Sequence, residues 1–124
     1  MTSLLAGSSF APMPTVRELV SAIRQRPGID AAVVTGRDGL MIVGDALPHV
    51  DLDDLAARVP PLLATAEDVA PGTRIAVIEH GSGYALVLWL GADAALLVLA
   101  QPTATLAPLV EELRRYRERI ADLV

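Results

Sequence analysis

Residues 26–44 read RPGIDAAVVTGRDGLMIVG, and this stretch is the most telling part of the sequence. Pro27-Gly28 stops a preceding helix, because proline lacks a backbone N–H and glycine suits the left-handed end of a helix. The runs from Ile29 to Thr35 and from Leu40 to Gly44 are apolar and β-branched, which favours strands. Between them, Gly36-Arg37-Asp38-Gly39 supplies the glycines that a tight reversal needs. The stretch therefore predicts a β-hairpin.

Amphipathic helices are predicted on both sides of this hairpin. Thr15 and Glu18 have the spacing of a capping box, and apolar residues follow at helical intervals, which predicts a helix over residues 15–26. After the hairpin, an acidic start and a longer apolar series predict a second helix over residues 51–70. Pro60-Pro61 removes two backbone donors from its middle, so this helix must kink there or split into two, and we expect a kink.

The second half of the chain has the pattern of three strands and a final helix. The strands are expected at residues 73–79, 84–90 and 95–100, with glycine-containing turns between them. The last two are apolar at nearly every position, so both faces of the sheet should be covered by helices. Thr105 is expected to cap a helix whose inner stripe runs to Leu123. The sequence thus predicts one α+β domain over residues 15–124, in the order α-β-β-α-β-β-β-α, after a flexible N-terminal tail at residues 1–14.

The composition argues against several classes of function. All 10 basic residues are arginine, which excludes a Schiff-base lysine and a phosphate-loop lysine. The formal net charge of -5 makes nucleic acid an unexpected partner. The chain has no cysteine, so it has no disulfide or thiolate chemistry, which fits a cytoplasmic protein. Its most apolar stretch is short and interrupted, so we expect no direct membrane insertion.

No catalytic or metal-binding constellation stands out. Gly81-Ser82-Gly83 lacks the first glycine of a nucleophile elbow, because His80 occupies that position. His49 precedes several aspartates, but the start of a helix favours acidic residues in the same place. A glycine-rich dinucleotide motif and a phosphate loop are also missing from the sequence. We therefore expect no enzyme, with no catalytic residue, no cofactor and no metal.

In its order of elements the chain resembles the roadblock/LC7 family, whose bacterial and archaeal members often accompany small Ras-like GTPases. The resemblance covers residues 15–123 and is carried by Arg26 to Val34, by Arg37 to Ile42, and by Ala95 to Ala100 running into Leu106 to Leu109. It implies a profilin-like, three-layer α/β/α fold in which a five-stranded antiparallel sheet lies between helices.

The resemblance also implies a homodimer that joins edge strands and pairs the second helices. The joining strand would consist of Thr73, Arg74, Ile75, Ala76, Val77, Ile78 and Glu79. An exposed apolar edge is an aggregation hazard unless another strand covers it, which supports this choice. The partner and helix-pairing face would consist of Leu52, Leu55, Ala56, Val59, Leu62, Leu63 and Ala66. Pro60-Pro61 departs from the smooth, alanine-rich second helix typical of the family.

The function implied is that of a non-enzymatic regulatory or scaffold module, which binds a small Ras-like GTPase and modulates its activity or localisation. Two alternatives stay open. A small-molecule sensor of profilin-like or PAS-like type would be expected to carry polar groups within its strands, and the last two strands offer almost none. A subunit of a larger assembly without a GTPase would use the same dimer surfaces, and the sequence does not distinguish these partners.

Overall fold

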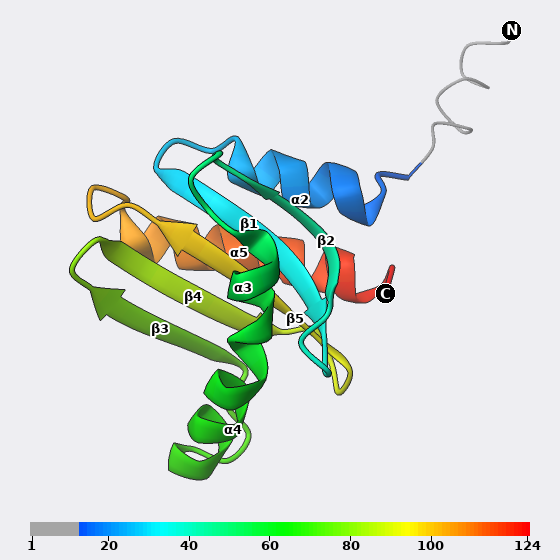
Figure 1. Ribbon diagram of the computed structural model, residues 1–124. Coiled ribbons are helices and arrows are strands. Elements are labelled where there is room, and N and C mark those ends of the chain that lie inside the picture. The colour runs from blue at the N-terminus through cyan, green and yellow to red at the C-terminus, as the bar shows by residue number, and fades with distance from the viewer. Residues whose placement is uncertain (1–12) are drawn as a thin grey trace, which may run out of the picture.

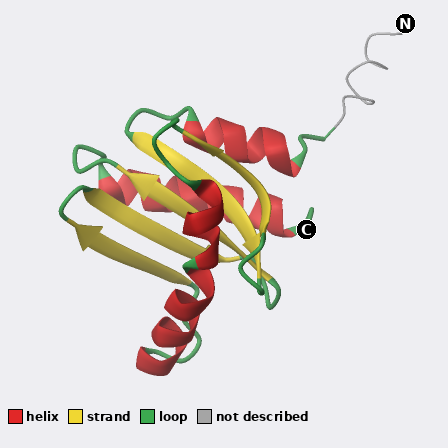
Figure 2. Cartoon of the chain, in the orientation of Figure 1, coloured by secondary structure: helices red, strands yellow, loops and turns green. Residues whose placement is uncertain are grey.

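The computed structural model describes residues 13–124 and shows a five-stranded antiparallel sheet with helices on both faces (Figures 1 and 2). The strands lie in the order β2-β1-β5-β4-β3. Helices α2 and α5 cover one face, and α3 and α4 lie on the other. The elements are α2 (Val16–Arg24), β1 (Ile29–Gly36), β2 (Met41–Ala46), α3 (Leu52–Ala57), α4 (Val59–Val69), β3 (Ile75–His80), β4 (Gly83–Trp89), β5 (Ala94–Ala100) and α5 (Leu106–Ala121).

The predicted α+β class, the three layers and the five antiparallel strands are confirmed. The predicted tail at residues 1–14 lies outside the described residues except for Met13 and Pro14.

The central strand β5 packs against helices on both of its faces. Leu96 and Val98 belong to the apolar cluster beneath α2 and α5. Ala95 and Leu97 belong to the cluster beneath α3 and α4. Each large side chain buried in this way stabilises the fold by about 1.5–3 kcal/mol relative to an exposed one. The expectation that both faces of this strand are covered is therefore confirmed.

Helix α2 begins at the predicted capping box. The hydroxyl of Thr15 accepts a hydrogen bond from the Glu18 N–H at 3.1 Å, and the Thr15 N–H donates to the Glu18 carboxylate at 2.8 Å. Hydrogen bonding to Thr15 lowers the pKa of the Glu18 carboxyl below its ordinary value. The Thr15 backbone makes the larger contribution and the Thr15 side chain the smaller one. Leu19, Val20 and Ile23 form the buried stripe of the helix.

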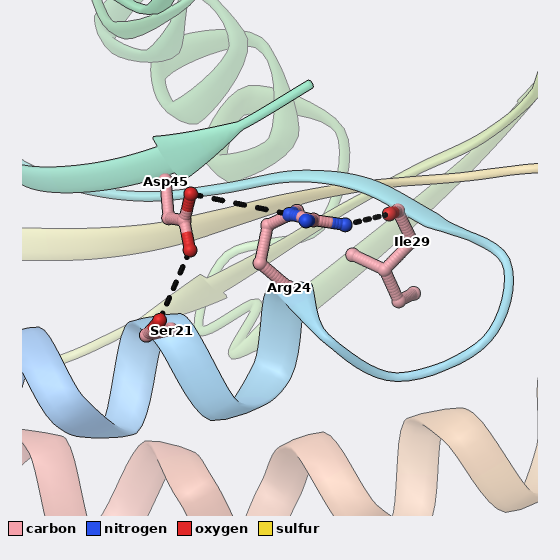
Figure 3. A network of polar contacts seen from close by, with 4 residues as sticks. All are labelled: Ser21, Arg24, Ile29 and Asp45. Atoms are coloured by element: carbon pink, nitrogen blue, oxygen red, sulfur yellow. Dashed lines mark hydrogen bonds and ion pairs between the residues drawn. The ribbon is translucent and has the colours of Figure 1, made fainter.

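A polar network ties α2 to the first two strands (Figure 3). The Ser21 hydroxyl donates to the Asp45 carboxylate at 3.1 Å. The Arg24 guanidinium donates to the Ile29 carbonyl at 3.3 Å, and its Nε lies 3.9 Å from an Asp45 oxygen. The end of β2 is thereby fixed against the helix layer.

The second helix is divided in two, so the expected single kinked helix over residues 51–70 is wrong. α3 ends at Ala57 and α4 begins at Val59, with Arg58 between them. Pro60 and Pro61 thus fall in the first turn of α4, where backbone N–H groups lack an intrahelical acceptor in any case. In one continuous helix, both prolines would interrupt the hydrogen-bond ladder and clash with the preceding turn.

Several other boundaries differ from the sequence expectations. β3 begins at Ile75 and not at Thr73, because the Thr73 N–H donates to the Ala70 carbonyl in the turn that follows α4. α5 ends at Ala121, which leaves Leu123 outside the inner stripe and 40% exposed. Thr105 occupies the position before α5, but its side chain makes no capping hydrogen bond.

The most constrained glycine of the described residues is Gly83, the first residue of β4, and it gives a test of the sheet geometry. A Cβ at Gly83 would lie 2.0 Å from the Ala100 carbonyl oxygen, and the residue has φ of 137°. Gly83→Ala is therefore expected to lower the free energy of unfolding by about 3 kcal/mol or more, measured by urea titration. Gly81→Ala is the control, because a Cβ there meets nothing within 4 Å. Equal stability of the two variants would contradict this geometry.

Candidate protein-docking surfaces

β3 is an open edge of the sheet. It pairs with β4 along one side, and none of the other described strands pairs with its second side. The Trp89 N–H donates to the Arg74 carbonyl at 3.1 Å, so Arg74 points its backbone groups toward β4. Backbone groups alternate in direction along a strand, so Ile75, Val77 and Glu79 point theirs away from the sheet. This edge has free donors and acceptors for another strand.

The side chains of the first four residues of β3, Ile75 to Ile78, are apolar on both faces of the sheet. Ile75 packs against the cluster beneath α2 and α5, and Val77 shares that face by alternation. Ala76 and Ile78 lie opposite Val87 and Ala85 of β4, on the face that carries α3 and α4. Val77 is 41% exposed and Ile78 is 38% exposed. The strand therefore presents exposed apolar side chains next to unpaired backbone groups.

The other edge of the sheet, β2, is less suited to strand pairing. Its register with β1 is interrupted by an irregularity where Val34 and Thr35 face Val43 and Met41. Its far end carries Asp45, which is engaged by α2. Leu40 and Ile42 are exposed at its beginning. β3 is consequently the longer uninterrupted edge.

The predicted partner face is divided by the structure into core and surface residues. Ala56 and Val59 are fully buried against the sheet, so they have no surface left for a partner, and their assignment to that face is wrong. Both residues lie at the junction of the helices, one on each side of Arg58. Five of the predicted residues are only half-buried: Leu52, Leu55, Leu62, Leu63 and Ala66.

Helix α4 is only partly supported by the sheet. Val59 is its one buried residue, and Figure 1 shows the helix continuing past the sheet toward the connection to β3. Its apolar stripe ends in Val69, which is 80% exposed. Because the apolar stripe of α4 extends beyond the sheet, part of it stays exposed and is available for contact with a partner.

The surface of α3 and α4 is acidic. Asp53 and Asp54 lie in the first turn of α3, and Glu67 and Asp68 are exposed near the end of α4. Arg58 is the one basic residue of this segment, and it donates to the Asp54 carboxylate at 3.0 Å. The face therefore combines half-buried leucines with a surplus of negative charge.

A cleft of about 390 Å³ lies beside α4, and apart from Leu63 its residues were not expected from the sequence. Leu63 and Glu67 of α4 form one wall, and Arg37 and Trp89 lie on the other, from the ends of β1 and β4. Arg37 reaches this place because its N–H donates to the Asp93 carbonyl at 2.9 Å, which joins the two turns. The residues that line the cleft come from segments far apart in the chain, so no local sequence motif predicts it.

The described residues do not assemble an ion-binding cluster. No group of three or more His, Asp or Glu side chains within residues 13–124 could hold a metal ion. His80, which stands where a nucleophile elbow would have its first glycine, accepts a hydrogen bond from the Ser82 N–H at 3.2 Å and lies exposed at the β3–β4 turn. Over the same range, the helices are too short or too polar to cross a bilayer.

Solved structures share this architecture. The crystal structure of a roadblock/LC7 domain from Streptomyces avermitilis has 26% sequence identity and a TM-score of 0.74, covering 88% of this chain and 97% of that one. The gliding protein MglB from Thermus thermophilus has 19% identity and a TM-score of 0.76, covering 93% and 95%. Myxococcus xanthus MglB has 10% identity and a TM-score of 0.79, covering 87% and 93%.

The chain thus has the roadblock/LC7 fold, and the resemblance stated from the sequence is confirmed. The two MglB structures share too few identical residues to show more than this fold. No protein-family model and no curated protein sequence matches the chain.

The division of the helices into core and surface can be tested with two identical substitutions. Val59→Ala should lower the free energy of unfolding by about 2 kcal/mol, because it leaves a cavity against the sheet. Val69→Ala, at the exposed end of the same helix, should change it by less than about 0.5 kcal/mol. Chemical denaturation of both variants at the same protein concentration provides the measurement. A larger loss for Val69→Ala would contradict the assignment.

Proposed function

We propose that this chain is a non-enzymatic, homodimeric regulatory or scaffold module that binds a small Ras-like GTPase in the cytoplasm and modulates its activity or localisation. The observation that carries the homodimer is the open β3 edge, where Val77 and Ile78 are exposed beside unpaired backbone groups. A second copy can cover this edge with its own β3, because a two-fold interface uses the same surface on both subunits.

The partner site in this proposal is the outer surface of α3 and α4, together with the cleft beside α4. Half-buried Leu62 and Leu63 provide apolar contact area, and Glu67 and Asp68 surround them with negative charge. Such a surface favours a partner with an apolar patch and basic residues around it. The roadblock/LC7 resemblance implies a Ras-like GTPase as that partner, with the nucleotide bound by the GTPase.

The cleft is the observation that favours a small-molecule sensor. Arg37 and Glu67 are its charged lining residues, and it is partly open to solvent. Small-molecule sites usually enclose most of the ligand and direct several polar groups at it. The cleft is therefore better suited to a side chain of a docked protein.

Dimerisation through β3 can be tested by placing a charge on each edge of the sheet. Val77→Lys should convert the dimer to a monomer in light scattering, because a lysine on an edge strand opposes pairing with a second strand. Ile42→Lys on β2 is the matched control and should remain a dimer. If Ile42→Lys dissociates the dimer and Val77→Lys does not, β2 is the joining edge.

Binding of a GTPase can be tested by affinity capture with the purified chain, in the presence of GDP or a non-hydrolysable GTP analogue. We expect recovery of a Ras-like GTPase that depends on the nucleotide. Reversing the charges of Glu67 and Asp68 to arginine should reduce the recovery about tenfold or more. The same change at Glu111 and Glu118, exposed on α5, is the control. Recovery of other proteins with no GTPase under either nucleotide would favour the assembly-subunit alternative.

A further inference from the structure

We infer that the cleft beside α4 receives a tyrosine side chain of the protein partner, with its ring against Trp89 and its hydroxyl between Arg37 and Glu67. The inference rests on the proposed function and adds which kind of residue anchors the partner. It follows from the walls of the cleft, from its apolar lining, and from two charged groups that line it without forming an ion pair.

Hydrogen bonds fix both walls of the cleft. The Arg37 N–H donates to the Asp93 carbonyl at 2.9 Å, and Figure 1 shows the two turns that carry these residues side by side at one end of the sheet. On the opposite wall, the Glu67 carboxylate accepts from the Gly72 N–H at 3.0 Å. The volume of about 390 Å³ is near the lower end of the range for ligand sites, about 300–1,000 Å³. The cleft therefore has room for one large side chain.

Most of the lining of the cleft is apolar. Trp89 is only half-buried, although it packs against the cluster beneath α3 and α4. Its ring thus leaves aromatic surface for a further contact, and aromatic rings pair favourably beyond the area they bury. Anchor residues that fill pockets at protein interfaces are also enriched in aromatic side chains. The apolar lining residues are Pro60, Leu63, Ala64, Trp89, Ala92 and Ala94.

Two charged side chains complete the lining. Arg37 and Glu67 are both exposed, and within residues 13–124 neither forms a salt bridge. Their charged atoms are thus more than 4.0 Å apart. A group between them would accept a hydrogen bond from the guanidinium and donate one to the carboxylate. A hydroxyl does both, whereas a carboxylate only accepts and an ammonium or guanidinium only donates.

A charged anchor would meet a like charge in this cleft. An aspartate or glutamate of the partner would face Glu67, and a lysine or arginine would face Arg37. An uncharged anchor avoids either repulsion. Tyrosine combines an uncharged aromatic ring with a hydroxyl that donates and accepts. It therefore matches both the apolar and the polar part of the lining.

The tyrosine belongs to a different protein and not to a second copy of this chain. The chain has two tyrosines, Tyr84 and Tyr116. Both pack against the cluster beneath α2 and α5, on the face of the sheet opposite to the cleft. A second copy would have to withdraw one of them from this packing before it could enter the cleft.

Capped amino acids test the preference for tyrosine. Acetyl-tyrosine amide, acetyl-phenylalanine amide and acetyl-arginine amide would each be titrated into the protein while the indole N–H signal of Trp89 is followed by NMR. The chain has one tryptophan, so this signal is unique. The tyrosine amide should bind about fivefold more tightly than the phenylalanine amide, because its hydroxyl bonds to charged groups, and the arginine amide should bind most weakly. Equal binding of the first two, or tightest binding of the third, would overturn the inference.

Removing the donor separates the hydroxyl contact from packing of the ring. Arg37→Met keeps the backbone hydrogen bond to Asp93, so the cleft should remain while the preference for tyrosine amide over phenylalanine amide disappears. Arg114→Met, exposed on α5, is the control and should keep the preference of about fivefold. A preference that survives Arg37→Met would contradict the placement of the hydroxyl.

Filling the cleft separates this inference from the proposed function. Ala64→Phe adds a ring to the α4 wall, and Ala107→Phe, on the exposed face of α5, is the control that should behave like the native chain. In the nucleotide-dependent capture, Ala64→Phe should recover about tenfold less GTPase and should remain a dimer in light scattering.

The outcomes distinguish the two proposals. Undiminished recovery of the GTPase by Ala64→Phe would overturn the cleft as the anchoring site and leave the GTPase partner in place. Loss of the dimer in Ala64→Phe would overturn the inference by assigning the cleft to the junction between two copies. Selective binding of the tyrosine amide to a native chain that captures no GTPase would support the tyrosine site and overturn the GTPase as its partner.

Discussion

The fold depends on the burial of β5 from every direction. Its backbone is paired with β1 on one side and β4 on the other, and helices cover both of its faces. A strand in this position cannot hold polar side chains without burying them, which explains the apolar run from Ala94 to Ala100. It also requires α5 and α2 to lie on one face and α3 on the other. At the beginning of β5, the β1–β2 turn and the β4–β5 turn lie side by side, which brings Arg37 and Trp89 into one cleft.

The proline pair has a comparable influence on the outer layer. Because of the prolines, α3 ends at Ala57 and α4 starts anew at Val59. The first turn of α4 remains in the core, and the rest of the helix leaves its leucines half-buried and Val69 exposed. The apolar stripe of α4 is thus larger than one copy of the sheet can cover. The same feature that departs from the family pattern provides surface for a partner.

Most of the fold could be predicted because its signals are local. The capping box at Thr15, the glycines of the hairpin and the apolar strands each act within a few residues. The partner face was harder to predict, since helical spacing alone did not show that Ala56 and Val59 are buried. At Arg58 the sequence allows either one kinked helix or two helices. The outcome depends on how the helices pack against the sheet, which helical spacing does not show. The cleft beside α4 joins segments far apart in the chain, so no sequence pattern marks it.

The acidic surface of α3 and α4 affects the two proposed associations in different ways. When two copies approach each other, their surplus carboxylates repel, so added salt speeds their encounter by screening that repulsion. A partner with a basic surface is attracted over a distance of several ångströms, and the same salt slows its arrival. Ionic strength therefore shifts the balance between self-association and partner capture, and the acidic face gives each process its own dependence of rate on salt.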